Sequence, residues 1–225
     1  MKEQAYKFTP LLSVLILTLL WSLYCFEYFS GLNFNYLGID PRKAIGLRGL
    51  IFAPLLHGSV KHLFNNSLAL FVLINALFYF YRDIALRVFL LTLLFSGLGT
   101  WVFGRSNIHI GASGLVYGLF GFIIISGLLR KNYRLMALAL ALIFWYGGLF
   151  WYLFPIEEHI SWEGHSSGFA CGVLLAFLYR HKGPSNDEYV FEKTEFDDYF
   201  DEDGNLKSSL SDGFIEESSA SDRNI

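Results

Sequence analysis

The chain is 225 residues long, and 54% of its residues are hydrophobic while 16% are charged. Ordinary soluble domains carry about 25% charged residues, so this composition excludes a soluble globular domain and indicates a protein that crosses a membrane several times. The formal net charge of −3 hides a division between residues 1–182, which are net basic, and residues 183–225, which are strongly acidic. We expect a membrane domain over the first part and a disordered cytoplasmic tail, with an unknown partner, over the second.

Six apolar segments each approach the ~17–25 residues that a helix needs to cross the hydrocarbon core, which predicts an all-α bundle of six membrane spans. The first span follows two lysines, as in a signal peptide, but no small-residue cleavage site follows it, so we expect it to be retained. Cys25 and Cys171 show no metal or disulfide spacing and are expected to be small core residues. The predicted spans are residues 8–29, 62–81, 84–103, 111–129, 133–154 and 164–179.

The segment between the first two spans, residues 30–61, is long but not polar. Such a composition predicts short amphipathic pieces that lie in the membrane interface. Arg48 and Pro54 argue against a seventh span within it.

Lys and Arg are unevenly distributed around the spans. Because loops rich in these residues stay in the cytoplasm, both termini are expected there, and the second, fourth and sixth spans all begin at the outer face. The cytoplasmic side then holds nine basic residues and the outer side five: Lys2, Lys7, Arg82, Arg87, Arg130, Lys131, Arg134, Arg180 and Lys182 against Arg42, Lys43, Arg48, Lys61 and Arg105.

These three spans carry polar residues in their first turns, so three polar clusters meet at one depth below the outer surface. The second span has His62 and Asn66 on one helix face, the fourth has Ser113 between glycines, and the sixth has His165. Each cluster alone has a structural explanation, because small and hydrogen-bonding residues both join membrane helices. Their convergence favours a functional site, since polar groups within a membrane are costly.

The residue types fit acyl transfer. The Ser113 hydroxyl becomes a nucleophile when a base removes its proton, and we expect His165 to be that base and later the acid toward the leaving amine. The oxyanion needs preorganised donors, which the Ser113 N–H at a helix N-terminus, the His62 ring and the Asn66 amide would supply. This is a Ser–His dyad, and no metal or other cofactor is expected.

Four glycines are expected to support this site. Gly111 and Gly114 let the backbone approach a ligand closely. Gly168 and Gly172 are spaced so that the sixth span can pack against the fourth, which would bring the two dyad residues together.

Tyr117 lies one turn after Ser113 and is expected to stack on the His165 ring. We expect no carboxylate to complete a triad, because Asp83 lies at the opposite membrane face and the acidic residues of the outer loop are expected to be solvated charges. Those residues are Glu157, Glu158 and Glu163.

The combined pattern resembles the rhomboid intramembrane serine proteases of the bacterial six-helix type. The resemblance covers about residues 48–180 and implies six helices around a water-filled site, with Ser113 as nucleophile and His165 as base. It also implies that His62 and Asn66 surround the oxyanion. It rests on three motifs in family order: His62-x-x-x-Asn66, Gly111-Ala112-Ser113-Gly114 with Tyr117, and Gly164-His165-x-x-Gly168-x-x-x-Gly172.

The resemblance further implies a bacterial inner-membrane protein that cuts membrane proteins near the outer end of a span. A helix in lipid has all its backbone groups hydrogen-bonded, so we expect substrates with helix-weak transmembrane segments and no nucleic-acid partner. Entry between helices is expected, with the fifth span as the moving element because of its Gly147-Gly148 pair and bulky aromatics.

Two other classes remain open. A non-catalytic rhomboid-like protein that binds and escorts membrane proteins predicts loss of the serine or the histidine, and both are present. A transporter that uses His62, Asn66 and His165 as a proton relay predicts paired broken helices in two repeated halves, for which the sequence has no counterpart.

Overall fold

The computed structural model of the protein describes residues 9–146, 151–157, 160–184, 196–201, 204, 205 and 207. The described residues form helices and loops and contain no strand, as expected of an all-α protein. The chain divides into two compact units, Met1–Asn186 and Asp187–Ile225. The described part of the second unit includes one helical turn, η5 (Asp197–Tyr199), so the predicted disorder of the tail stays a prediction.

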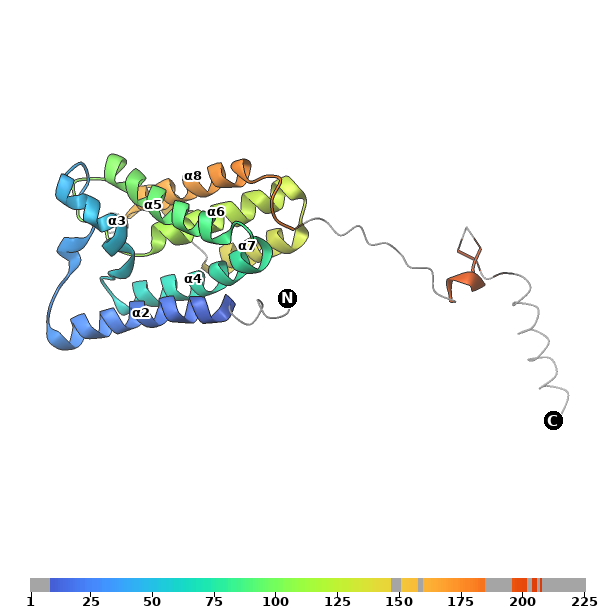
Figure 1. Cartoon of the computed structure of the whole chain (residues 1–225), viewed down its shortest axis with the longest axis horizontal. Helices are drawn as coiled ribbons and strands as arrows, with labels where there is room; N and C mark the ends of the chain where they lie inside the picture. Colours follow the sequence, from blue (N-terminus) through green and yellow to red (C-terminus); the bar gives the residue numbers. More distant parts are fainter. Residues whose placement is uncertain are drawn as a thin grey trace, which may run out of the picture. The chain divides into compact units, whose positions relative to one another are not determined.

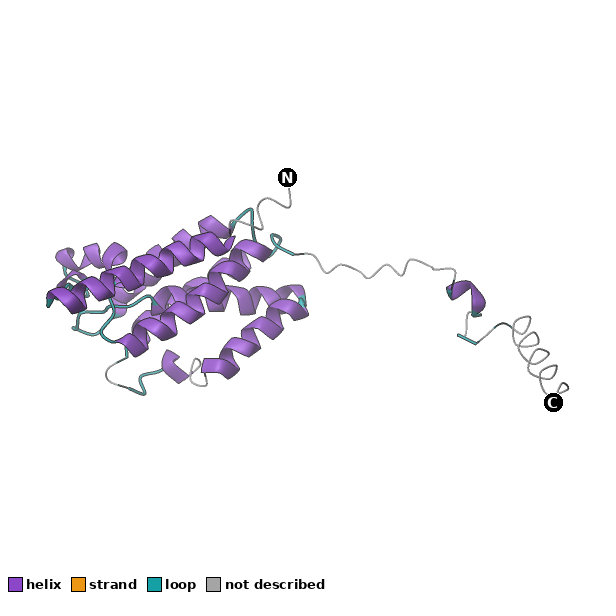
Figure 2. Cartoon of the chain, turned by 90° about the horizontal axis from the view of Figure 1, so that it is seen from below, coloured by secondary structure: helices purple, strands orange, loops and turns teal. Residues whose placement is uncertain are grey.

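Six helices of 14 to 22 residues lie side by side in the described part of the first unit (Figures 1 and 2). Four of them, α2, α4, α5 and α6, are long and apolar enough to cross a membrane, and the expectation that all six do so stays a prediction. The helices are α2 (Thr9–Ser30), α4 (Val60–Phe80), α5 (Ala85–Phe103), α6 (Ser113–Arg130), α7 (Tyr133–Tyr146) and α8 (Trp162–Leu178).

Five of these helices begin and end within two residues of the predicted spans, and the exception is α7. It ends at Tyr146 instead of residue 154. The Gly147-Gly148 pair and Phe150 lie outside the described residues, and a separate 3-10 turn, η4 (Trp151–Leu153), follows. The fifth predicted span is therefore not one continuous helix through residue 154, and its proposed movement is untested.

α6 is the most deeply buried of the four long helices. Within the most apolar 18-residue window of each helix, 61% of the window is buried in α6 and 11% in α2. Large side chains of α6 such as Leu119, Phe122 and Ile123 pack into one core cluster with Leu73 and Leu77 of α4. Ser113 is the first residue of this central helix, so its position is set by the best-packed element of the bundle.

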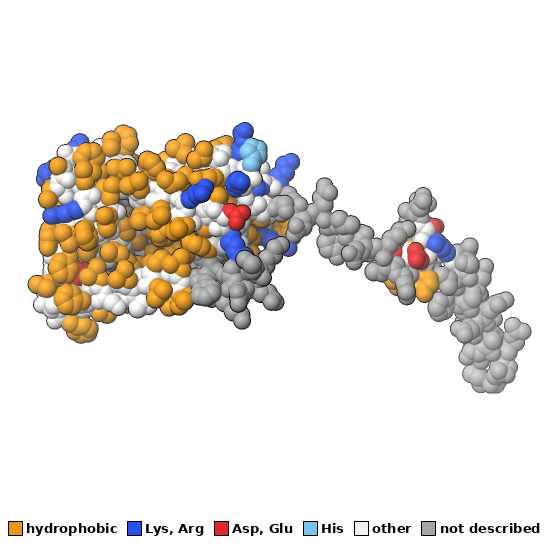
Figure 3. All heavy atoms as spheres, viewed as in Figure 1, with side chains coloured by type: hydrophobic (Ala, Val, Ile, Leu, Met, Phe, Trp, Pro, Cys, Tyr) orange, Lys and Arg blue, Asp and Glu red, His pale blue; other side chains and the backbone are white. Residues whose placement is uncertain are grey.

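The outer surface of the bundle is apolar. Figure 3 shows a broad band of hydrophobic side chains, with Lys and Arg toward its two ends. Large apolar side chains of α2 are exposed as well, with Leu15 at 57% and Leu19 at 54%. Such a surface suits lipid. Cys25 is exposed on this helix, so it is not the core residue that we expected, whereas Cys171 is buried as predicted.

The loop before α4 contains the short helical pieces that its composition predicts. Apolar residues on these pieces stay exposed, with Ile45 at 59% and Ile51 at 69%, so an interfacial position remains the expectation. Backbone hydrogen bonds between Ile39 and His109, both 2.9 Å, tie this loop to the one that precedes α6. The pieces are η1 (Asn35–Leu37), η2 (Ala44–Arg48), α3 (Gly49–Phe52) and η3 (Ala53–Leu55).

Candidate active site

Glycines allow α6 and α8 to pack backbone against backbone. A Cβ added at Gly168 would overlap the Gly114 carbonyl oxygen, and one added at Gly172 would overlap the Gly118 carbonyl oxygen. The expected role of Gly168 and Gly172 in helix packing is thus visible in the contacts. Gly114 lies against α8 as well, because a Cβ there would lie 3.3 Å from the Gly164 carbonyl oxygen. The backbone at Gly114 therefore lies close to another helix, α8.

Ser113 follows a tight turn instead of continuing a helix. Gly111 has φ +111, a conformation that L side chains rarely adopt, and its N–H donates to the Ala53 carbonyl at 2.8 Å. Gly111 and Ala112 therefore precede α6, although we had expected them within the span. No side chain caps the N-terminus of α6, and the Ser113 N–H makes no hydrogen bond with another described residue. It stays available to an acceptor.

The Ser113 hydroxyl likewise has no hydrogen-bond partner among the described residues. Ser113 lines a cavity of about 30 Å³ between α3, α5, α6 and the start of α8. Such a volume holds about two water molecules. Its other polar walls include Ser96, Thr100, His109 and Ser161.

His165 is held on α8 by two contacts. Its ring stacks on Tyr117 with centroids 4.2 Å apart and planes 13° apart, as expected from the spacing of Tyr117. Its Nδ1 lies 2.9 Å from the Tyr152 carbonyl oxygen. A carbonyl oxygen can only accept, so Nδ1 carries a proton, and in the neutral ring Nε2 keeps its lone pair. Ser166 donates to the next carbonyl, that of Leu153, at 2.6 Å, which anchors the same segment to α8.

Ser113 and His165 are neighbours without a mutual hydrogen bond in this structure. Ser113 and Tyr117 are four residues apart on α6 and share one face, and the His165 ring covers Tyr117. The imidazole therefore lies over the residue that is one helical turn after the serine. In an enzyme without bound substrate, such hydrogen bonds are often long and tighten only in the reacting complex.

His62 and Asn66 of α4 reach the turn before Ser113, so the three predicted polar clusters do meet. A Cβ added at Gly111 would lie 2.6 Å from His62 Cε1 and 3.7 Å from Asn66 Nδ2. Only a glycine leaves room for these two side chains. Ser59 caps α4 by accepting from the His62 N–H at 3.1 Å, which fixes where this first turn begins.

One histidine in this region was not predicted to take part. His57, in the loop before α4, is only 4% exposed, and its Nε2 lies 3.1 Å from Asn66 Nδ2. Its ring also meets His62 edge-on, with centroids 5.1 Å apart. Burial, with a smaller contribution from His62, lowers the pKa of His57 to about 4. The side chain is therefore neutral near pH 7.

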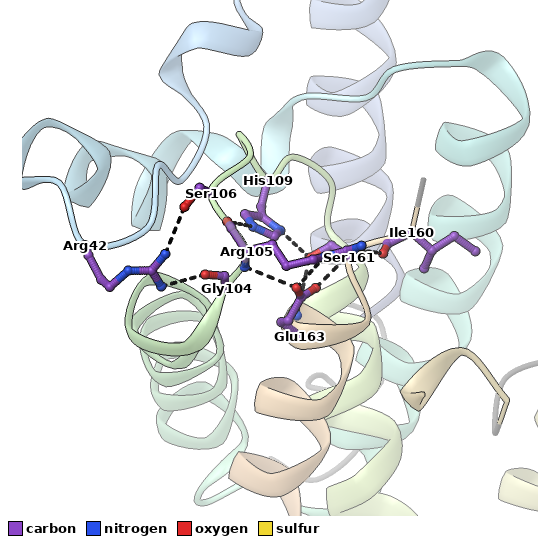
Figure 4. Close-up of polar contacts among 9 residues, drawn as sticks. Arg42, Gly104, Arg105, Ser106, His109, Ile160, Ser161 and Glu163 are labelled. Carbon is purple, nitrogen blue, oxygen red and sulfur yellow. Dashed lines mark hydrogen bonds and ion pairs between the residues drawn. The ribbon is translucent and has the colours of Figure 1, made fainter. Parts of the chain in front are cut away.

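A second polar network joins the loop before α6 to the start of α8 (Figure 4). Arg105 Nε forms an ion pair with Glu163 at 2.6 Å, and its Nη2 donates to the Ile160 carbonyl at 2.7 Å. Glu163 is only 2% exposed, so our expectation of a solvated charge was wrong. The carboxylate is buried because Arg105, far away in the sequence, provides its counter-charge. Of the other two carboxylates, Glu157 is exposed and Glu158 lies outside the described residues.

His109 and Arg42 complete this network. His109 Nε2 lies 3.0 Å from the Arg105 carbonyl oxygen and must donate to it, so Nδ1 accepts from the Ser161 hydroxyl at 2.6 Å. Ser161 also caps α8 by accepting from the Gly164 N–H at 3.3 Å. Arg42 donates to the Gly104 carbonyl at 2.7 Å. The N-terminal ends of α6 and α8, which carry Ser113 and His165, are thus linked by hydrogen bonds that do not involve the dyad itself.

The geometry defines a helical membrane protein with a serine, an imidazole and two potential oxyanion donors around one glycine turn. Comparison with known proteins agrees with this description. A family model described as the Rhomboid domain matches residues 46–182. The chain therefore belongs to the rhomboid family and is an integral membrane protein.

The chain is also similar to individual proteins of this kind. Uncharacterized proteins of Mycobacterium tuberculosis and Mycobacterium bovis are 37% identical over 178 residues, which cover 72% of this chain and 73% of theirs. A Bacillus subtilis protein named "Putative rhomboid protease YdcA" is 31% identical over 144 residues, covering 57% of this chain and 65% of that protein.

Proposed function

We propose that the protein is an intramembrane serine endopeptidase that cleaves transmembrane segments of other membrane proteins with a Ser113–His165 dyad. The observation that carries this proposal is the state of His165. Its Nδ1 is held by the Tyr152 carbonyl and its ring stacks on Tyr117, the residue one turn after the serine, so Nε2 of the neutral ring keeps a lone pair for the Ser113 proton. A general base needs this combination of a fixed ring and a free lone pair.

In the proposed reaction, the Ser113 oxygen attacks the scissile carbonyl carbon while His165 Nε2 takes the hydroxyl proton. The resulting oxyanion accepts hydrogen bonds from the Ser113 N–H, His62 and Asn66. As the C–N bond breaks, the imidazolium returns the proton to the leaving amine. Water, activated by the same imidazole, then hydrolyses the acyl-enzyme and releases Ser113.

The same proposal specifies the substrate and the membrane side. A transmembrane helix must unwind before its backbone can react, so segments that are weak helix formers are preferred. The distribution of basic residues supports cytoplasmic termini and a site near the outer face of a bacterial inner membrane. Access would be lateral, from lipid, and no cofactor would be needed.

The test uses the full chain in proteoliposomes with a single-span substrate that has a Gly-rich segment near its outer end. We expect Ser113→Ala and His165→Ala each to lower cleavage by about 10³-fold or more, with unchanged thermal unfolding of the Ser113→Ala variant. A fluorophosphonate should label the wild type at Ser113 and leave the Ser113→Ala variant unlabelled.

Full cleavage by either variant would refute the dyad. A wild-type protein that binds the substrate, cleaves nothing and takes no label would instead indicate the non-catalytic escort protein.

A further inference from the structure

His57 is a buried polar side chain that has no role in the reaction steps proposed above. It lies outside α4 and is 4% exposed, and its Nδ1 has no hydrogen bond of normal geometry with another described residue, although the Leu55 backbone interacts with the ring and, against the larger effect of burial, raises its pKa. Burying such a group is unfavourable unless its remaining hydrogen bond contributes something. That hydrogen bond joins His57 Nε2 to the Asn66 amide.

The chemistry of this hydrogen bond sets the orientation of Asn66. The amide nitrogen can only donate, so Nε2 of His57 must be the acceptor and its ring proton must lie on Nδ1. With the amide in this orientation, Nδ2 faces both His57 and the Gly111 turn. One N–H is used by His57, and the second has no partner among the described residues, which leaves it free for a ligand at the turn.

Without His57, the Asn66 amide could rotate by half a turn at little cost. Its oxygen would then face the Gly111 turn and repel an oxyanion instead of stabilising it. The electrostatic interaction between the Asn66 amide and an oxyanion at the turn would then be of similar size but repulsive instead of attractive. The imidazole prevents this in the tautomer with its proton on Nδ1, because the Nε2 lone pair then accepts from nitrogen and repels the amide oxygen. Hydrogen bonding of the ring to the Leu55 backbone favours that tautomer.

We infer that His57 is a positioning residue that keeps the N–H of Asn66 directed toward the oxyanion formed beside Ser113. This inference rests on the proposed function. His57 itself would not touch the substrate. It acts through Asn66, and the His62 ring lies beside it with centroids 5.1 Å apart.

The kinetic test compares two substitutions in the full chain. His57→Gln keeps a hydrogen-bond acceptor, whereas His57→Leu has a similar volume and none. We expect His57→Leu to lower kcat about tenfold with little change in KM, since an oxyanion donor acts in the transition state, and His57→Gln to retain most of the wild-type kcat. Equal losses in the two variants would contradict the need for an acceptor.

A double-mutant cycle separates positioning from a structural role. In an Asn66→Ala background, His57→Leu should lower kcat by less than about twofold, because the residue through which it acts is gone. His109→Ala, another buried loop histidine that does not touch Asn66, is the matched control and should have the same effect in both backgrounds. A full tenfold loss from His57→Leu in the Asn66→Ala background would overturn the inference.

An independent measurement does not require activity and so distinguishes failure of this inference from failure of the proposed function. In protein labelled with ¹⁵N-histidine, the His57 resonances are assigned by their absence in His57→Gln. Near pH 7 we expect a neutral ring with the proton on Nδ1, and a changed Nε2 shift in Asn66→Ala. A proton on Nε2 would overturn the inference even if the protein is a protease. An inactive protein with the expected tautomer would refute only the proposed reaction.

Discussion

The N-terminal end of α6 is held in two different ways by its two neighbours. Toward α8 the contact is between backbones, because Gly114 and Gly118 face Gly168 and Gly172. Toward α4 the contact is made by the side chains that pack on Gly111. On the α8 side the glycine backbones set the separation of the two helices, and Tyr117 stacks on His165 across the same contact. On the α4 side, hydrogen bonds between side chains decide the orientation of the donors.

This difference indicates which substitutions should change the stability of the fold and which should change the rate of cleavage. Changes on the α8 side should separate helices and therefore alter the fold and the activity together. Changes on the α4 side should alter the activity with smaller effects on unfolding, as expected for His57. The following predictions test the α8 side, from the largest effect to the smallest.

The largest effect is expected from Gly168→Val, which places a branched side chain against the Gly114 carbonyl. Overpacking of this kind costs about 1–3 kcal/mol or more. Misplacement of the dyad by about 1 Å can cost roughly 100-fold in rate. We expect a lower thermal unfolding midpoint in detergent and a loss of cleavage of at least that size. Gly58→Ala is the control, because its nearest neighbour would be Ile110 Cδ1 at 3.8 Å. An unchanged midpoint for Gly168→Val would show that the two helices are not tightly packed.

The meeting of the three polar clusters could be predicted because it follows from regular structure. His62, Ser113 and His165 each lie in the first turn of a helix. These helices run in the same direction, and any bundle of them places their first turns together. The glycine spacing at Gly168 and Gly172 predicted the α6–α8 contact for the same reason. The stacking of Tyr117 followed from its position one turn beyond the serine.

What could not be predicted depends on contacts between distant residues. The Tyr152 carbonyl that holds His165 is a backbone group and has no side-chain pattern. The burial of Glu163 depends on Arg105, and the role of His57 depends on its approach to Asn66. A pattern of polar residues close to a span could have indicated His57, which lies five residues before His62. A single histidine in a loop, however, is found both at surfaces and in buried sites, so the sequence could not place its ring against Asn66.

An intermediate effect is expected from the buried ion pair. Glu163→Gln keeps the shape of the side chain and removes its charge beside Arg105. Hydrogen bonds to charged groups contribute about 1.5–3 kcal/mol. Because the Arg105 side chain is 37% exposed and solvent screens its charge, we expect a loss below this range, about 1 kcal/mol, in the free energy of unfolding.

Lys43→Ala is the matched control for the charge. It removes the exposed ion pair between Lys43 and Asp40, whose side chains are 67% and 22% exposed, and should change stability by less than about 0.5 kcal/mol. The free energy of unfolding is measured by chemical denaturation. Equal losses for Glu163→Gln and Lys43→Ala would mean that the network at the start of α8 adds no stability beyond that of the glycine packing.

The smallest effect is expected at the opposite end of α8, where the acidic tail begins. Arg130 of α6 donates to the carbonyls of Tyr179, Arg180, Lys182 and Pro184 in the segment that follows α8. A chain cut after residue 186 keeps all four contacts, so its unfolding midpoint should be unchanged and its cleavage rate within about twofold of the full chain. A chain cut after residue 182 loses only the Pro184 contact, the longest at 3.4 Å, and should lose at most about 1 kcal/mol. Loss of cleavage after the cut at 186, with the midpoint retained, would show that the tail takes part in the reaction.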